Sequence, residues 1–169
     1  TQGVSSAASD VYKRQTSFNH LTDLKDAIGK ELGLTEWNVI TQEKINTFAE
    51  LTGDTQWIHI DEEKSKKYSP YGQTVAHGFF VLSFAAKFAN ETYQINDVTM
   101  GVNYGLDKVR FPHPTLSGSK VRGRLSLMEF NEFDGGGRYK FKVVFECQGT
   151  EKPVCVAEFI GQAYTKKDE

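Results

Sequence analysis

An aspartate and a histidine stand five residues apart in the segment TGDTQWIHID, and both side chains can exchange protons with a small molecule. Asp54 follows Gly53, a residue type that favours the left-handed conformation at a helix end, so we expect Asp54 just beyond a helix. His59 comes shortly before Asp61, whose side chain is a good N-cap for the next helix. Asp54 and His59 would then share one tight loop, where a carboxylate and an imidazole can hold one water molecule as general base and general acid.

A second histidine stands at the start of an apolar stretch, in the segment VAHGFFVLS. Residues 75–89 are apolar almost all round, with Lys87 as the clear polar exception, and this predicts a helix buried in the core. His77 and Gly78 would open that helix, where backbone N–H groups lack intrahelical partners and the helix dipole is positive. Such donors can stabilise an oxyanion, and the missing side chain of Gly78 lets a substrate carbonyl approach closely.

Each of these residues also has a purely structural interpretation. Gly53 and Asp54 are compatible with an ordinary helix end and turn, His59 with a hydrogen-bonded loop histidine, and His77 with a residue that merely starts a helix. Spacing alone favours the structural interpretation, and the choice therefore depends on several motifs taken together.

Three separated segments, in order, resemble the MaoC-like or hydratase 2 family. TGDTQWIHID is similar to the family signature of Gly-Asp, a short variable insert, an apolar residue and His. Gln56 and Trp57 stand where many members have Asn-Pro, which we interpret as a pocket difference rather than lost activity. VAHGFFVLS resembles the second family segment, His-Gly and then an apolar helix with a serine six residues after the histidine. VNYGLDKVRFPHPTLSGSKVRGR is similar to the subgroup that includes nodulation protein N and mycobacterial (R)-specific enoyl-CoA hydratases, so the resemblance covers about residues 21–164.

The resemblance implies an α+β hotdog fold, in which an antiparallel β-sheet wraps around a long buried central helix. It also implies reversible syn addition of water to a trans-2-enoyl-CoA, giving the (R)-3-hydroxyacyl-CoA. By position, Asp54 matches the base that acts on water and His59 its acid partner, and which of the two delivers the α-proton is left open. Gly78 matches the oxyanion-hole donor, with His77 beside it, and Ser83 matches a serine that lines the site. The expected protein is a hydro-lyase without a cofactor of its own, since the substrate carries the coenzyme A.

Binding of the coenzyme and of a second subunit follow from the same resemblance. Lys108, Arg110 and Arg122 lie in or after the third segment and are candidates for holding the phosphates of coenzyme A. Strand lysines and arginines also commonly face solvent or protect a sheet edge, and residue by residue this alternative is favoured. Hotdog subunits usually pair, so we expect a homodimer whose sheets join.

Three other functions stay open. The first is a dehydratase of carrier-bound, branched or dicarboxylic acyl thioesters, and the second is a hotdog thioesterase. The third is a non-catalytic acyl-CoA-binding subunit, against which the complete set of Asp54, His59, Gly78 and Ser83 argues.

Composition and charge set the broad class of the protein. The chain has 169 residues, a length that suits one domain. It contains 20 Lys plus Arg and 22 Asp plus Glu, so its near-neutral net charge does not indicate binding to nucleic acid or to an anionic membrane. There is neither an apolar run of spanning length nor a basic and apolar leader, so we expect a cytoplasmic protein. The histidines show no metal-ligand spacing beyond the Asp54 loop, and no metal is expected. Cys147 and Cys155 flank a GTEKP turn and are expected as reduced thiols rather than a disulfide.

The order of elements supports the fold that the resemblance implies. Residues 1–17 are small, polar and aperiodic and are predicted to be a flexible tail or an expression remnant, leaving 18–169 as the hotdog domain. Apolar residues at helical spacing predict a short helix from Leu21 to Leu32, followed by one strand around Val39. Four strands are predicted after the central helix, at 98–111 with a bulge at Gly105, then at 121–130, 139–145 and 152–164. The sequence DGGG at 134–137 predicts a tight hairpin between the middle two.

Overall fold

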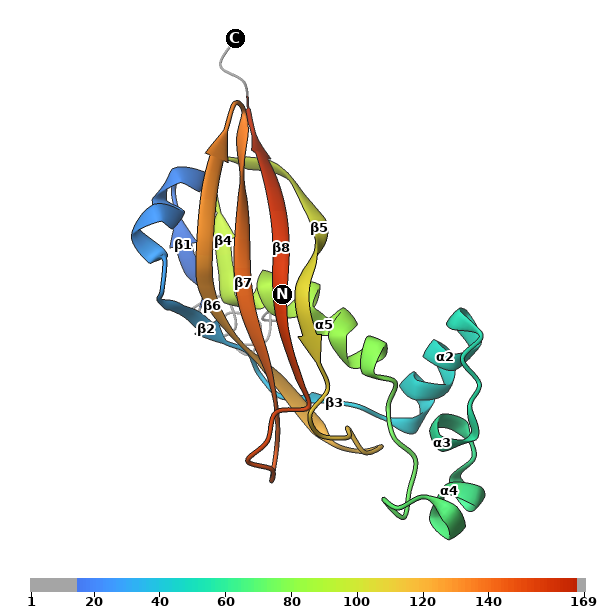
Figure 1. Ribbon diagram of the computed structural model, residues 1–169. Helices are drawn as coiled ribbons and strands as arrows, with labels where there is room; N and C mark the ends of the chain where they lie inside the picture. The colour runs from blue at the N-terminus through green and yellow to red at the C-terminus, as the bar shows by residue number, and fades with distance from the viewer. Residues whose placement is uncertain (1–14, 167–169) are drawn as a thin grey trace, which may run out of the picture.

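An antiparallel sheet dominates the computed structural model, which describes residues 15–166 (Figure 1). Its strands lie in the order β2 (Glu31–Leu34), β6 (Lys120–Phe133), β7 (Gly136–Cys147), β8 (Cys155–Thr165) and β5 (Val98–Arg110). The short strand β3 (Asn38–Val39) pairs with β6. Strands β1 (Thr16–Phe18) and β4 (Tyr93–Ile95) form a separate parallel pair.

The core lies between this sheet and helix α5 (Gly78–Thr92). Side chains alternate along β7 as the sequence predicts, so that four apolar residues of this strand are buried: Tyr139, Phe141, Val143 and Phe145. Phe88 of α5 is fully buried and lies against Gly123 of β6, where a Cβ atom would meet the phenyl ring at 2.2 Å. The predicted architecture of an antiparallel sheet around a central helix is therefore confirmed. One side of α5 is not covered, and Phe79 on that side is 72% exposed.

Three short helices form a group of their own beside the start of α5, as Figure 1 shows: α2 (Gln42–Thr52), α3 (Trp57–Ile60) and α4 (Glu62–Tyr68). The Thr41 side chain caps α2, Gly53 ends it with φ 76°, and Asp61 caps α4 by accepting from the Lys64 amide at 2.8 Å. The helix end at Gly53 and the N-cap at Asp61 had been predicted from the sequence and are confirmed. Within residues 15–166, no helix combines the length and the apolar character needed to cross a bilayer.

The N-terminal part differs from the prediction. The helix predicted to run to Leu32 is a 3-10 helix, η1 (Leu21–Ala27), and Leu32 is instead a buried residue of β2. Gly29, with φ 80°, turns the chain between the two elements, so the helical spacing of Leu32 was coincidental. From residue 15 onward, three strands precede α5 where one was predicted. Residues 1–14 of the predicted tail lie outside the described part, and 16–17 belong to β1.

The four long strands after α5 follow the prediction closely, whereas the short strand β4, which follows α5 directly, was not predicted. β5 has a register shift between Asn103 and Gly105, where the bulge was expected, and a turn at 134–135 joins β6 to β7. Cys147 and Cys155 are both free and buried, in agreement with the expectation of reduced thiols. Burial raises the pKa of the Cys155 thiol to about 12, so this thiol stays protonated and unreactive at neutral pH.

Candidate active site

His59 lies in α3 with its ring turned into the protein. Its side chain is only 7% exposed, and Nδ1 lies 2.6 Å from the backbone carbonyl oxygen of Val75. A carbonyl can only accept, so Nδ1 carries the proton and donates it, which leaves a lone pair on Nε2. Burial lowers the pKa of His59, and the neighbouring His77 ring lowers it further. His59 is therefore a neutral base at neutral pH, with Nε2 as its acceptor atom.

His77 connects His59 to the loop that carries Asp54. The two imidazole rings are stacked, with centroids 3.7 Å apart and planes at 27°. Nε2 of His77 donates to the backbone carbonyl of Asp54 at 2.9 Å, and it lies 4.0 Å from the Asp54 carboxylate. Nδ1 of His77 is buried and has no hydrogen-bond partner among the described residues. His77, which the sequence analysis placed with the oxyanion donors, thus lies between the two predicted catalytic residues.

Asp54 completes a compact cluster at the surface. One carboxylate oxygen or ring nitrogen from each of Asp54, His59 and His77 lies within 4.8 Å of the others. The Asp54 side chain is 57% exposed, so the cluster is open to solvent on this side. A water molecule can bond an Asp54 oxygen and a His59 nitrogen at once across such a distance. The three side chains are also of the types that bind metal ions, and the expectation of no metal stays a prediction.

Gly78 is the first residue of α5, and His77 is its N-cap. The aromatic ring of Phe111, just after β5, lies over Gly78 so closely that a Cβ atom there would meet ring atoms at 3.0 Å. Phe79 meets the same ring edge-on, with centroids 6.2 Å apart. Sequence reasoning missed Phe111, because only the path of β5 through the sheet brings it to the helix start. The amides of the first turn have no acceptor within the helix, as the oxyanion prediction requires.

Ser83 lies elsewhere on α5. It is exposed, and its hydroxyl donates to the Phe80 carbonyl at 2.6 Å. Among the residues at 15–166, its side chain makes no hydrogen bond to Asp54 or His59. A role for Ser83 in lining the site stays a prediction.

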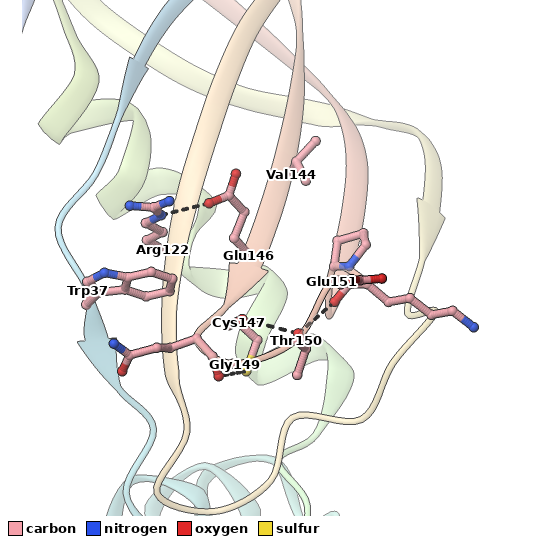
Figure 2. A pocket seen from close by; sticks show the side chains of 11 residues that line it. Trp37, Arg122, Val144, Glu146, Cys147, Gly149, Thr150 and Glu151 are labelled. Carbon is pink, nitrogen blue, oxygen red and sulfur yellow. Dashed lines mark hydrogen bonds and ion pairs between the residues drawn. The ribbon is translucent and has the colours of Figure 1, made fainter.

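The three candidates for coenzyme A binding do not lie together. Lys108 and Arg110 are exposed at the end of β5, where Lys108 contacts Glu158 at 3.2 Å. Arg122 instead lines a pocket of about 340 Å³ on the sheet, which is not lined by Asp54, His59 or His77. Figure 2 shows Arg122 directed toward Glu146 in this pocket, beside Trp37.

The charge of Arg122 is already compensated. Its Nε donates to Glu146 at 2.7 Å, and its guanidinium group lies 4.3 Å from the centre of the Trp37 ring. Glu146 also accepts from Arg124 at 2.8 Å, and Arg124 in turn binds Glu31. A phosphate would compete with these carboxylates for Arg122. Lys108 is likewise paired with a carboxylate, that of Glu158, so charge compensation does not favour it over Arg122. The predicted role in coenzyme A binding stays a prediction for all three residues.

Comparisons with known proteins agree on one family. Residues 23–144 match the model of the MaoC like domain. The chain is 41% identical to 3-hydroxyacyl-thioester dehydratase Z of Mycobacterium tuberculosis over 145 residues, covering 85% of this chain and 95% of the relative. It is also 41% identical to nodulation protein N of Rhizobium leguminosarum, covering 83% and 88%. Among solved structures, an (R)-hydratase from A. caviae involved in PHA biosynthesis superposes with a TM-score of 0.65 at 14% identity, covering 79% of this chain and 94% of that one.

Proposed function

The chain belongs to the MaoC-like family of hotdog dehydratases, and from that premise we propose that it is an (R)-specific enoyl-CoA hydratase. In this role it adds water reversibly to a trans-2-enoyl-CoA and produces the (R)-3-hydroxyacyl-CoA. The observation that supports the proposal most directly is the cluster of a carboxylate and a neutral imidazole within 4.8 Å of one another. The dehydratase relative supports a thioester substrate.

The hydrogen bonds of His59 favour one assignment of the catalytic roles of Asp54 and His59. The sequence analysis assigned the base to Asp54 and the acid to His59. Because the pKa of His59 is lowered and Nδ1 is committed to Val75, we now assign the first proton transfer to Nε2 of His59. Nε2 takes a proton from water as the oxygen attacks C3 of the enoyl group, and Asp54 holds the water and stabilises the imidazolium that forms. The imidazolium then returns that proton to C2, so water is added across the double bond from one side.

Negative charge moves to the thioester oxygen between these two steps. The amide of Gly78, at the positive end of α5, would stabilise this enolate oxygen, and one such donor is typically worth about 3 kcal/mol of the barrier. The aromatic ring of Phe111 would shield that oxygen from water and so strengthen the hydrogen bond.

Incubation of the purified protein with crotonyl-CoA tests the proposal. We expect the enoyl absorbance to fall and a chiral assay to identify the (R)-alcohol. Release of free thiol would indicate a thioesterase instead. If crotonyl-CoA is inert but an enoyl group on a carrier protein is hydrated, the enzyme is a carrier-dependent dehydratase. No turnover of either compound would indicate a binding subunit.

We also propose that two chains pair through β5 to form a homodimer. Strand β5 is the last strand of the sheet and is exposed along most of its length on both faces. Four of its residues are exposed apolar side chains, and long apolar edge strands are normally covered in native proteins: Met100, Val102, Tyr104 and Leu106. The uncovered side of α5, with Phe79, and the ring of Phe111 add to this surface, which would place Gly78 next to the partner subunit.

The double variant Val102→Glu, Leu106→Glu is expected to convert the dimer into a monomer and to reduce hydration, because paired copies of β5 would bring like charges together. Light scattering coupled to size exclusion measures the mass directly. Leu51→Glu is the matched control, since Leu51 is an 82% exposed leucine on α2, away from β5. A wild-type monomer, or a double variant of unchanged mass, would contradict the pairing.

A further inference from the structure

Gln42, the first residue of α2, joins the segments on both sides of His59. Its Nε2 donates to the backbone carbonyl of His59 at 2.7 Å, and its Oε1 accepts from the hydroxyl of Thr74 at 2.5 Å. Thr74 is followed by Val75, whose carbonyl holds Nδ1 of His59. The hydrogen bonds therefore close a circuit that runs from Gln42 to His59, to Val75, to Thr74 and back to Gln42.

The chemistry of the partners fixes the orientation of the Gln42 amide. The His59 carbonyl can only accept, so the NH₂ group of Gln42 must face it. Its second N–H donates to Oδ1 of Asn46 at 2.8 Å, and its oxygen faces Thr74. Both donors and the acceptor of this amide are thus used. Thr74 is only 2% exposed, and within the described part of the chain its buried hydroxyl is satisfied by this bond to Gln42.

We propose that Gln42 is a positioning residue for His59, which keeps the His59 ring on the Val75 carbonyl and so keeps its Nε2 lone pair directed to the site. The inference depends on the proposed function only for its effect on turnover. The closed circuit of hydrogen bonds supports it independently.

A backbone hydrogen bond between Val75 and Ile58 also joins the two segments, but it does not orient the ring of His59 as the circuit does. In this bond the amide of Val75 donates to the Ile58 carbonyl at 3.0 Å. An imidazole free in water prefers its proton on Nε2, the nitrogen that must be bare to accept one from water. A small displacement of the Val75 carbonyl would therefore release the ring and return it to the wrong tautomer.

The experiment compares Gln42→Met, which keeps the length of the side chain but removes its donors and acceptor, with wild type. We expect kcat of Gln42→Met to fall about ten- to a hundredfold with KM changed less than about threefold, as for a misplaced catalytic group. Nitrogen-15 NMR of the imidazoles provides a readout that does not need activity. The His59 signals, assigned with His59→Gln, should show Nδ1 protonated in wild type and a mixture of tautomers in the variant.

Matched variants distinguish the positioning of His59 by Gln42 from a general loss of stability of the protein. Asn46→Ala removes the outer bond of Gln42 and should keep kcat within about twofold, and Thr74→Ser should behave like wild type while Thr74→Val loses activity. Because both ends belong to one circuit, the double variant Gln42→Met, Thr74→Val should lose no more than the worse single variant. An unchanged tautomer in Gln42→Met, or an equal loss in Asn46→Ala, would overturn the inference. If wild type fails to hydrate any enoyl thioester, the proposed function fails, and the tautomer measurement still decides the role of Gln42.

Discussion

Replacing Asp54 by asparagine is expected to lower kcat/KM for hydration by about 10²- to 10⁴-fold, the range for removing a group that stabilises charge formed in the transition state. Asparagine can still bond a water molecule, but it cannot stabilise the imidazolium that forms on His59. The fold should survive, because the carboxylate is 57% exposed and His77 holds the backbone carbonyl of Asp54, which the variant keeps. Steady-state kinetics with crotonyl-CoA and a thermal melt measure the two parts of this prediction.

Asp61 provides the matched control for Asp54. It stands in the same stretch, and its carboxylate caps α4 by accepting from the Lys64 amide. Asparagine is an equally good N-cap, so Asp61→Asn should change neither kcat/KM nor the melting temperature appreciably. Turnover by Asp54→Asn within about threefold of wild type would exclude Asp54 as the group that stabilises the imidazolium of His59.

The parts of the site that could be predicted are those that local sequence determines. Gly53 and Asp61 are a helix stop and a helix start, so the connection between them followed from turn and capping chemistry. The expectation that Asp54 and His59 share a loop was wrong for His59, which lies in the one-turn helix α3. Strands β6 and β7 were equally predictable, because one face of each is buried and apolar residues alternate along them.

The parts that could not be predicted depend on contacts between distant segments. Phe111 reaches Gly78 only because β5, the last strand of the sheet, ends beside the start of α5, and nothing near either residue in the sequence indicates the contact. Gln42 looks like an ordinary residue in the first turn of a helix, yet its amide reaches His59 and Thr74. The same limit explains Leu32, which stands at helical spacing after Leu24 and Ile28 but lies in β2, because that strand pairs with the distant β6.

The acid side of the pH profile should report His59. Burial and the adjacent His77 lower the pKa of His59 below its ordinary value of 6.5, and the proposed mechanism requires the neutral ring. A lowered pKa means that half of the rings are protonated only at a pH below 6.5, so the midpoint of the decline in log kcat/KM should lie on the acid side of 6.5. Asp54 raises the pKa of His59, and its replacement by asparagine should therefore move the decline of the residual activity to still lower pH.

His59→Gln is expected to lower kcat/KM by about 10²- to 10⁴-fold and to abolish this decline, because glutamine can bond a water molecule but cannot take its proton. His20→Gln is the control, since His20 is an exposed histidine whose Nδ1 contacts Asp97 and which takes no part in the cluster. A decline that persists in His59→Gln would assign the titrating group to another residue, and the division of labour between Asp54 and His59 would then have to be reversed. If the decline disappears only in His59→Gln, the neutral imidazole that Val75 orients is the group that takes the proton from water.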